Sequence, residues 1–251
     1  MPTDTVGPPP AVIELRQYTL RRRRRDELIE LFDREFIETQ EEAGMSVLGQ
    51  FRDLDDPDRF VWLRGFRDMA ARHRALTAFY GGPAWSEHGP HANDTMIDSD
   101  DVLLLRPVPA GSGFTVSPAA RPPAARPPVG APPPDRFVAA TVWSFPPGRQ
   151  DGIALIRDGL LPVLKETGPA PLAFLATEPA HNTFSRLPVR TGENVAAVFT
   201  SYPDENAHRR HLDDLQAHPL TRGEILPAIE REQTSAPRTL RLTPTGRSLI
   251  S

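Results

Sequence analysis

The sequence of 251 residues contains no cysteine and a single lysine, Lys165. The missing cysteine excludes disulfides, thiolate metal ligands and cysteine nucleophiles. No apolar run approaches the roughly 18 residues that a membrane-spanning helix needs. The segment Met1–Pro10 is rich in proline and lacks the apolar core of a signal peptide. We therefore expect a cytoplasmic protein that has no membrane partner.

Charge and motifs exclude two further classes of function. The net charge is -4, which gives no general reason to expect nucleic acid as a partner. The five consecutive arginines at 21–25 lie beside acidic residues and are interpreted as a solvated turn. The chain has no glycine-rich phosphate loop, so nucleotide-dependent chemistry is disfavoured.

Many of the 29 prolines lie between Pro107 and Pro134. Such a stretch cannot build a packed core, and we interpret it as an extended, semi-stiff linker. The predicted division is a flexible N-terminal tail at 1–11, a folded unit at 12–108, the linker at 109–135, a second unit at 136–244 and a C-terminal tail at 245–251.

The hydrophobic spacing of the first unit predicts the order βαββαβ. Strands are expected at 12–20, 45–51, 60–66 and 102–106, and helices at 26–43 and from Asp68 to Tyr80. Gly44 should end the first helix, and Asp68 should cap the start of the second.

The second unit repeats this order at low identity, with Tyr18 aligned to Trp143 and Phe66 to Tyr202. An insertion at 179–193 lengthens the loop between its two middle strands. The predicted fold class is therefore α+β: two tandem ferredoxin-like repeats that form a pseudo-dimeric α/β barrel within one chain, with helices outside.

Three segments of the first unit resemble the NIPSNAP family: Glu14–Tyr18, Val61–Asp68 with Arg72, and Ala78–Trp85. This resemblance implies membership of the dimeric α/β-barrel superfamily. Relatives there include cofactor-free monooxygenases, haem enzymes, and isomerases or lyases. The second unit departs from the pattern, because His208 aligns with Arg72 and Thr221 with Trp85. Any site need not be twofold symmetric.

The first strand has two unlike faces, one with Ile13 and Leu15 and the other with Glu14, Arg16 and Tyr18. We expect the apolar pair to pack on the helices and the polar face to line the space between the two sheets. Arg16 would hold an anionic or carbonyl group and Tyr18 would donate a hydrogen bond. A structural salt bridge inside the barrel is the alternative.

Other candidates follow from the aromatic and histidine residues. His88 and His91 lie in an expected loop before the last strand of the first unit and would act as a base or as a haem ligand. The alternative is a surface loop in which Trp85 caps the helix end. Substrate contacts are expected from a further set of residues: Glu14, Trp62, Tyr80, Trp85, Thr141 and Trp143.

His208 and His211 are spaced to share one side of a metal, but no third ligand is obvious beyond His181 or Asp214. No metal site is therefore predicted.

We therefore predict a small-molecule enzyme of specialised metabolism that works on an organic substrate in the barrel cavity without a nucleotide or other cofactor. A cofactor-independent monooxygenase and an isomerase or lyase both stay open. The alternative is a non-catalytic scaffold or a protein that binds a small molecule or haem. Duplication removes the need for a homodimer but does not forbid one.

Overall fold

The computed structural model describes residues 9–123 and 135–250. The first half contains β1 (Val12–Leu20), α1 (Arg25–Leu31), a π-helical turn (Phe32–Phe36), α2 (Ile37–Glu42), β2 (Ser46–Asp53), β3 (Arg59–Phe66), α3 (Met69–Tyr80), α4 (Pro83–Thr95) and β4 (Met96–Pro107). A short 3₁₀ turn at Pro118–Ala120 follows.

The second half contains β5 (Phe137–Ser144), α5 (Asp151–Leu155), a π-helical turn (Ile156–Leu160), α6 (Leu161–Thr167), β6 (Ala173–Thr177), β7 (Val195–Tyr202), α7 (Glu205–Ala217), a π-helical turn (Thr221–Ile225), α8 (Leu226–Glu232) and β8 (Arg238–Pro244). No helix in the described ranges is long and apolar enough to cross a membrane.

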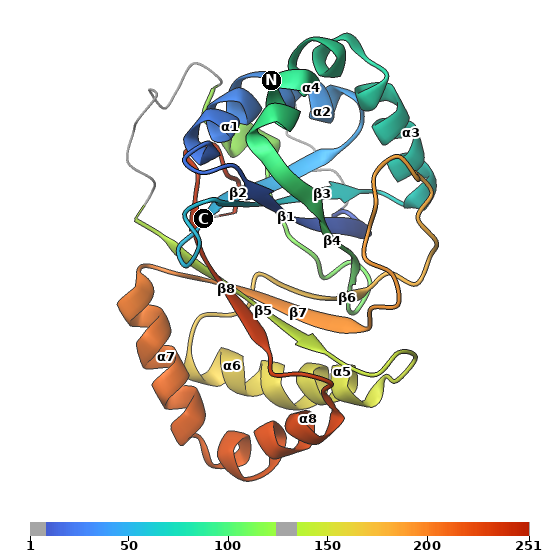
Figure 1. Ribbon diagram of the computed structural model, residues 1–251. Coiled ribbons are helices and arrows are strands. Elements are labelled where there is room, and N and C mark those ends of the chain that lie inside the picture. The colour runs from blue at the N-terminus through green and yellow to red at the C-terminus, as the bar shows by residue number, and fades with distance from the viewer. Residues whose placement is uncertain (1–8, 124–134, 251) are drawn as a thin grey trace, which may run out of the picture.

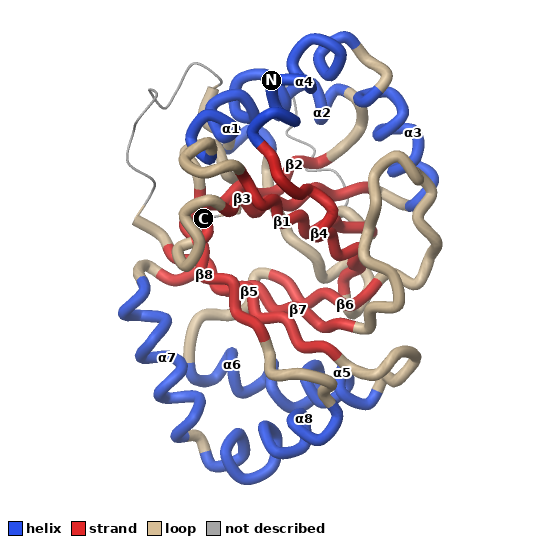
Figure 2. The backbone as a smooth tube through the Cα atoms, viewed as in Figure 1, coloured by secondary structure: helices blue, strands red, loops and turns tan. Residues whose placement is uncertain are grey.

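The strands close into an antiparallel barrel in the order β1-β3-β2-β8-β5-β7-β6-β4. Two seams join the halves: β2 pairs with β8, for example Phe51 with Pro244, and β4 pairs with β6, for example Leu105 with Thr177. Helices α1–α4 cover one side of the barrel and α5–α8 cover the opposite side (Figures 1 and 2). The predicted barrel with external helices is confirmed.

Local signals in the sequence place the first-half elements well. Gly44 follows α2 with a φ of 97°, a conformation that glycine adopts without strain. The Asp68 side chain caps α3 by accepting from the Ala71 amide. Asp204 caps α7 in the same way, through the Ala207 amide.

The predicted orientation of β1 is wrong. Ile13 and Leu15 belong to one apolar cluster with Val138, Leu175 and Phe199 of the second half, so they point into the barrel. An eight-stranded barrel is just wide enough for side chains to fill its interior. The alternate residues Glu14, Arg16 and Tyr18 consequently face the helices of the first half.

The segments outside the two predicted units also pack against the barrel. Phe114, from the described part of the expected linker, is buried in the interior cluster together with Ile250 from the expected C-terminal tail. Arg121 donates to the Arg247 carbonyl at 2.7 Å. Residues 1–8 of the expected N-terminal tail and residues 124–134 of the linker lie outside the described ranges.

Leu15→Ala should reduce the free energy of unfolding by about 2–5 kcal/mol, because it leaves a cavity among side chains that cannot collapse into it. Leu54→Ala is the matched control, since Leu54 is 45% exposed. Urea unfolding measures both. A Leu15 variant that is no less stable than the Leu54 variant would contradict the inward orientation.

Candidate functional site

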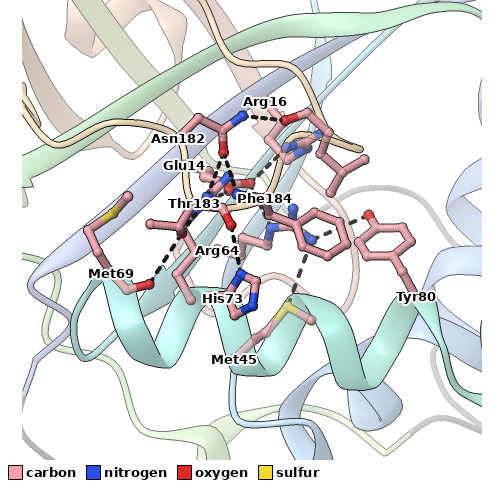
Figure 3. Close-up of polar contacts among 12 residues, drawn as sticks. Glu14, Arg16, Met45, Arg64, Met69, His73, Tyr80, Asn182, Thr183 and Phe184 are labelled. Carbon is pink, nitrogen blue, oxygen red and sulfur yellow. Dashed lines mark hydrogen bonds and ion pairs between the residues drawn. The ribbon is translucent and has the colours of Figure 1, made fainter.

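A buried ion cluster lies between the first-half sheet and its helices (Figure 3). Glu14 on β1 accepts from Arg16 Nη1 at 2.7 Å, from Arg64 Nε at 2.8 Å and from Arg72 Nε at 2.6 Å. All four side chains are at most 1% exposed. Three cations therefore share one carboxylate out of contact with water.

Strand register and helix capping bring these groups together. Glu14 and Arg64 are direct cross-strand partners on β1 and β3, and Arg16 lies two residues along β1 on the same face. Arg72 comes from the first turns of α3, which Asp68 fixes over the sheet. Burial alone would raise the pKa of Glu14, but the three guanidinium groups lower it far below its usual range. Glu14 is thus a permanent anion.

The guanidinium groups have surplus donors. Arg64 Nη1 lies 3.3 Å from Gln40 Oε1 and 3.5 Å from the Tyr80 hydroxyl. The Nη2 atoms of Arg64 and Arg72 are buried and have no hydrogen-bond partner among the described residues. Neutral oxygens, rather than further carboxylates, occupy the rest of the cluster.

A segment of the second half covers this cluster. Asn182 Oδ1 accepts from Arg72 Nη1 at 2.9 Å, and the Thr183 carbonyl lies 2.7 Å from His73 Nδ1 (Figure 3). Phe184 is buried and its ring centroid lies 5.9 Å from that of Tyr80. These residues belong to the inserted loop at 179–193, so the two halves of the chain build one site.

Beside the cluster is a cavity of about 30 Å³, walled mainly by aromatic rings. Its lining residues are Tyr18, Leu28, Phe32, Phe36, Gln40, Trp62, Phe79, Tyr80, Trp85, Ala92 and Met96. The predicted contacts Trp62, Tyr80 and Trp85 are therefore brought together with Tyr18. These rings offer apolar and stacking contacts to a flat organic molecule once the walls move apart, because about 30 Å³ holds water-sized molecules only.

Tyr18 joins the cavity to the ion cluster. Its hydroxyl oxygen accepts from Arg16 Nε at 2.9 Å. Burial raises the pKa of Tyr18, although Arg16 opposes this shift, and the phenol keeps its proton at neutral pH. The hydroxyl has no other partner among the described residues, so its hydrogen is available to a ligand. Trp62 Nε1 is also buried without a partner there.

His88 and His91 do not line the cavity. The expected loop is helix α4, because Gly82 and Pro83 begin a new helix where the sequence was interpreted as continuing in a loop. His91 Nε2 lies 2.6 Å from Glu27 Oε1, and His88 Nε2 lies 3.4 Å from Glu35 Oε2. Both histidines contact glutamate side chains near the surface, outside the cavity lining.

The second-half candidates do not join this site. Trp143 packs in the core of the opposite helical layer, and Thr141 Oγ1 lies 2.9 Å from Thr239 Oγ1. His211 bridges the Tyr202 hydroxyl and Thr167, while His208 stacks on Phe137. No group of three metal-binding side chains occurs in the described part of the chain.

Five contributors were not singled out as site residues from the sequence: Gln40, Arg64, Arg72, Asn182 and Phe184. The sequence did contain a signal for Arg64, because Arg64 lies on the same face of β3 as Trp62 and Phe66. Arg72 stood within the family pattern, but its contact with β1 could not be inferred. Asn182 and Phe184 come from the other half of the chain, and only the closed barrel brings them near.

The first half of the chain matches a known protein family. Residues 13–111 match the NIPSNAP family model, and this stretch includes the whole ion cluster except its cover. The resemblance predicted from the sequence is confirmed for this part of the chain. No curated protein matches the sequence significantly.

Solved structures match nearly the whole chain in fold. A protein provisionally called a monooxygenase from Lactobacillus acidophilus has a TM-score of 0.54 at 13% identity, covering 97% of this chain and 100% of its own. A similarly named protein from Fusobacterium nucleatum gives 0.58 at 9%, covering 94% and 93%. An anthrone oxidase-like protein gives 0.58 at 11%, covering 94% and 92%. At these identities the likeness is one of fold.

Glu14→Gln should reduce the free energy of unfolding by about 3–5 kcal/mol, because three buried guanidinium groups lose the one carboxylate that pairs with them among the described residues. The exposed pair Glu30–Arg34, 2.8 Å apart, gives the control: Glu30→Gln should cost less than about 1 kcal/mol. Urea unfolding at pH 7 measures both. Equal effects of the two substitutions would contradict the buried role of Glu14.

The difference in stability between the wild type and the Glu14→Gln variant should depend on pH. The folded-state pKa of Glu14 is lowered, so its contribution is fully present above its unfolded pKa of about 4.3 and is lost as the pH falls below that value. The stability difference between wild type and Glu14→Gln should be constant from about pH 7 to 5.5 and shrink below about pH 4. A difference that grows on acidification would be inconsistent with this sign.

Proposed function

We propose that the aromatic cavity of the first half binds a small, flat organic molecule and that the protein is an enzyme acting on it without a nucleotide. The observation that carries this proposal is Tyr18: its oxygen accepts from Arg16 while its own hydrogen stays free at the cavity wall. A phenol held in this way donates to an oxygen that gains negative charge during a reaction.

The reaction that this arrangement supports best is oxygen-dependent oxidation of an electron-rich aromatic compound. Arg16 and Tyr18 would stabilise the enolate or phenolate form, whose electrons reduce dioxygen. For an anthrone the balance is one anthrone and one O₂ to one anthraquinone and one water. The substrate itself is the reductant, so the scheme requires no reduced nucleotide.

The cavity favours oxidation over an isomerase or lyase reaction. Proton-transfer enzymes need a positioned base within hydrogen-bond reach of the substrate. None of the residues that line the cavity is a carboxylate or a histidine, and Glu14 is committed to three arginines. The substrate must therefore be acidic enough to lose its proton readily, as hydroxylated anthrones are.

Two non-catalytic roles, a scaffold and a haem protein, are alternatives to this enzyme. A scaffold role is favoured by the small cavity, since about 30 Å³ accommodates water-sized molecules only, and an aromatic ligand requires the cavity walls to move apart. A haem protein would need an axial ligand, and the histidines considered for that role lie outside the cavity lining.

We further propose that the chain arose by duplication of one ferredoxin-like unit. Matching details support this view: a π-helical turn interrupts the first helix of both halves, at Phe32–Phe36 and at Ile156–Leu160. Asp68 and Asp204 cap equivalent helices through the amide three residues on. Among the residues that the structure describes, the counterpart of this ion cluster is absent from the second half.

Tyr18→Phe should lower the turnover of 1,8-dihydroxyanthrone by about 10²-fold, because one donor to the developing oxyanion is removed. Tyr202→Phe is the matched control, since Tyr202 also has a buried hydrogen-bonded hydroxyl but lies in the other half. Oxygen uptake and the absorbance of the anthraquinone report the rate. Soret absorbance of the purified protein is recorded in parallel.

Wild-type turnover no faster than the uncatalysed oxidation would reject this substrate class. Equal rates for the wild type and the Tyr18→Phe variant would remove the proposed role of the hydroxyl. A Soret band would replace the cofactor-free scheme by the haem alternative.

A further inference from the structure

The ion cluster carries more positive charge than its surroundings balance. Arg16, Arg64 and Arg72 each form an ion pair with Glu14 and with no other carboxylate of the described residues. Three positive charges and one negative charge leave a surplus of two. Because an unpaired buried charge is costly, such groups are normally paired or bind a charged partner.

The two donors without a partner, Arg64 Nη2 and Arg72 Nη2, both lie near the Glu14 carboxylate. A guanidinium group has a fixed planar geometry, in which Nε–H and one Nη2–H point from the same edge. Arg64 and Arg72 both turn this edge to Glu14, because their Nε atoms donate to its Oε2 and Oε1. Their buried Nη2 atoms, which lack partners among the described residues, therefore flank the same carboxylate.

The cover of the cluster is neutral where a counter-charge would be expected. Asn182 presents an amide oxygen to Arg72 at 2.9 Å, and Thr183 adds a hydroxyl at 3.4 Å. Figure 3 shows Asn182, Thr183 and Phe184 close to Glu14 and Arg64, on a loop that comes from the second half. This loop lies between β6 and β7 and contains no helix or strand of its own.

We infer that the Arg64–Arg72 edge beneath Asn182 is a binding site for a carboxylate-like anion, completed by the second half of the chain. The site adjoins the proposed substrate cavity, because Gln40 and Tyr80 contact Arg64 and also line that cavity. The anion is therefore either the acidic group of an aromatic acid or a free small anion. The inference shares the cavity with the proposed function but does not depend on the oxidation.

Binding to the full-length protein is measured by thermal shift and by calorimetry, with sodium acetate, inorganic phosphate and 2-naphthoate as probes. Sodium chloride at equal ionic strength corrects for screening. A ligand that binds only the folded state raises Tm in a saturable way.

We expect saturable stabilisation by acetate. Affinity for 2-naphthoate at least about tenfold higher, with competition by acetate, identifies an aromatic acid. Equal affinities identify a free small anion.

Asn182→Asp places a carboxylate next to Arg72 and should weaken acetate binding by about tenfold or more, because the added charge occupies the role of the ligand. Asn206→Asp is the matched control. It adds the same charge beside Arg209, 3.0 Å from Asn206 Oδ1 on the exposed face of α7, so it should keep acetate affinity within about threefold of wild type.

The inference is overturned if none of the three anions stabilises the wild-type protein beyond sodium chloride, a result that needs no variant to fold. It is also overturned if Asn182→Asp and Asn206→Asp bind acetate alike. Tyr18→Phe should keep acetate binding even where turnover is lost. Failure of the oxidation and failure of the anion site are therefore distinguishable.

Discussion

The attraction between Glu14 and three buried arginines is the interaction on which the architecture of the first half depends. It joins β1, β3 and α3 at distances of 2.6–2.8 Å where water is excluded. Such a network is costly to assemble, since each ion loses its hydration, and it is destabilising when only partly satisfied. The surrounding aromatic rings and the covering loop keep the site dry, and this strengthens every charge interaction within it.

The network also explains why the halves of the chain differ in their interiors. In the second half the equivalent space between sheet and helices holds Trp143 and a largely apolar core, with His211 bonded to both Tyr202 and Thr167. The first half therefore contains the proposed site, and the second half has a mainly structural core. The second half also contributes to the site, because its inserted loop supplies Asn182 and Phe184.

The closed barrel makes this division of labour possible. Apolar side chains from both halves fill its centre, so the strands are held by a common core and by two seams. The proposed ligand site lies instead between the first-half sheet and its helices. Neighbouring residues of β1 point to opposite sides of the sheet. A substitution on the side that faces the barrel interior should therefore change stability, whereas a substitution of Tyr18 should change the rate of the proposed reaction.

The sequence alone determined the order of the strands, the ends of helices such as those at Gly44 and Asp68, and the aromatic set of Trp62, Tyr80 and Trp85, but it predicted a loop where helix α4 lies. These features depend on local periodicity, capping and a family pattern. Only the tertiary structure decided which face of β1 meets the helices, because alternation defines two faces without saying what covers each. Barrel closure likewise decided that Asn182 meets Arg72, since no local signal connects residues so far apart in the chain.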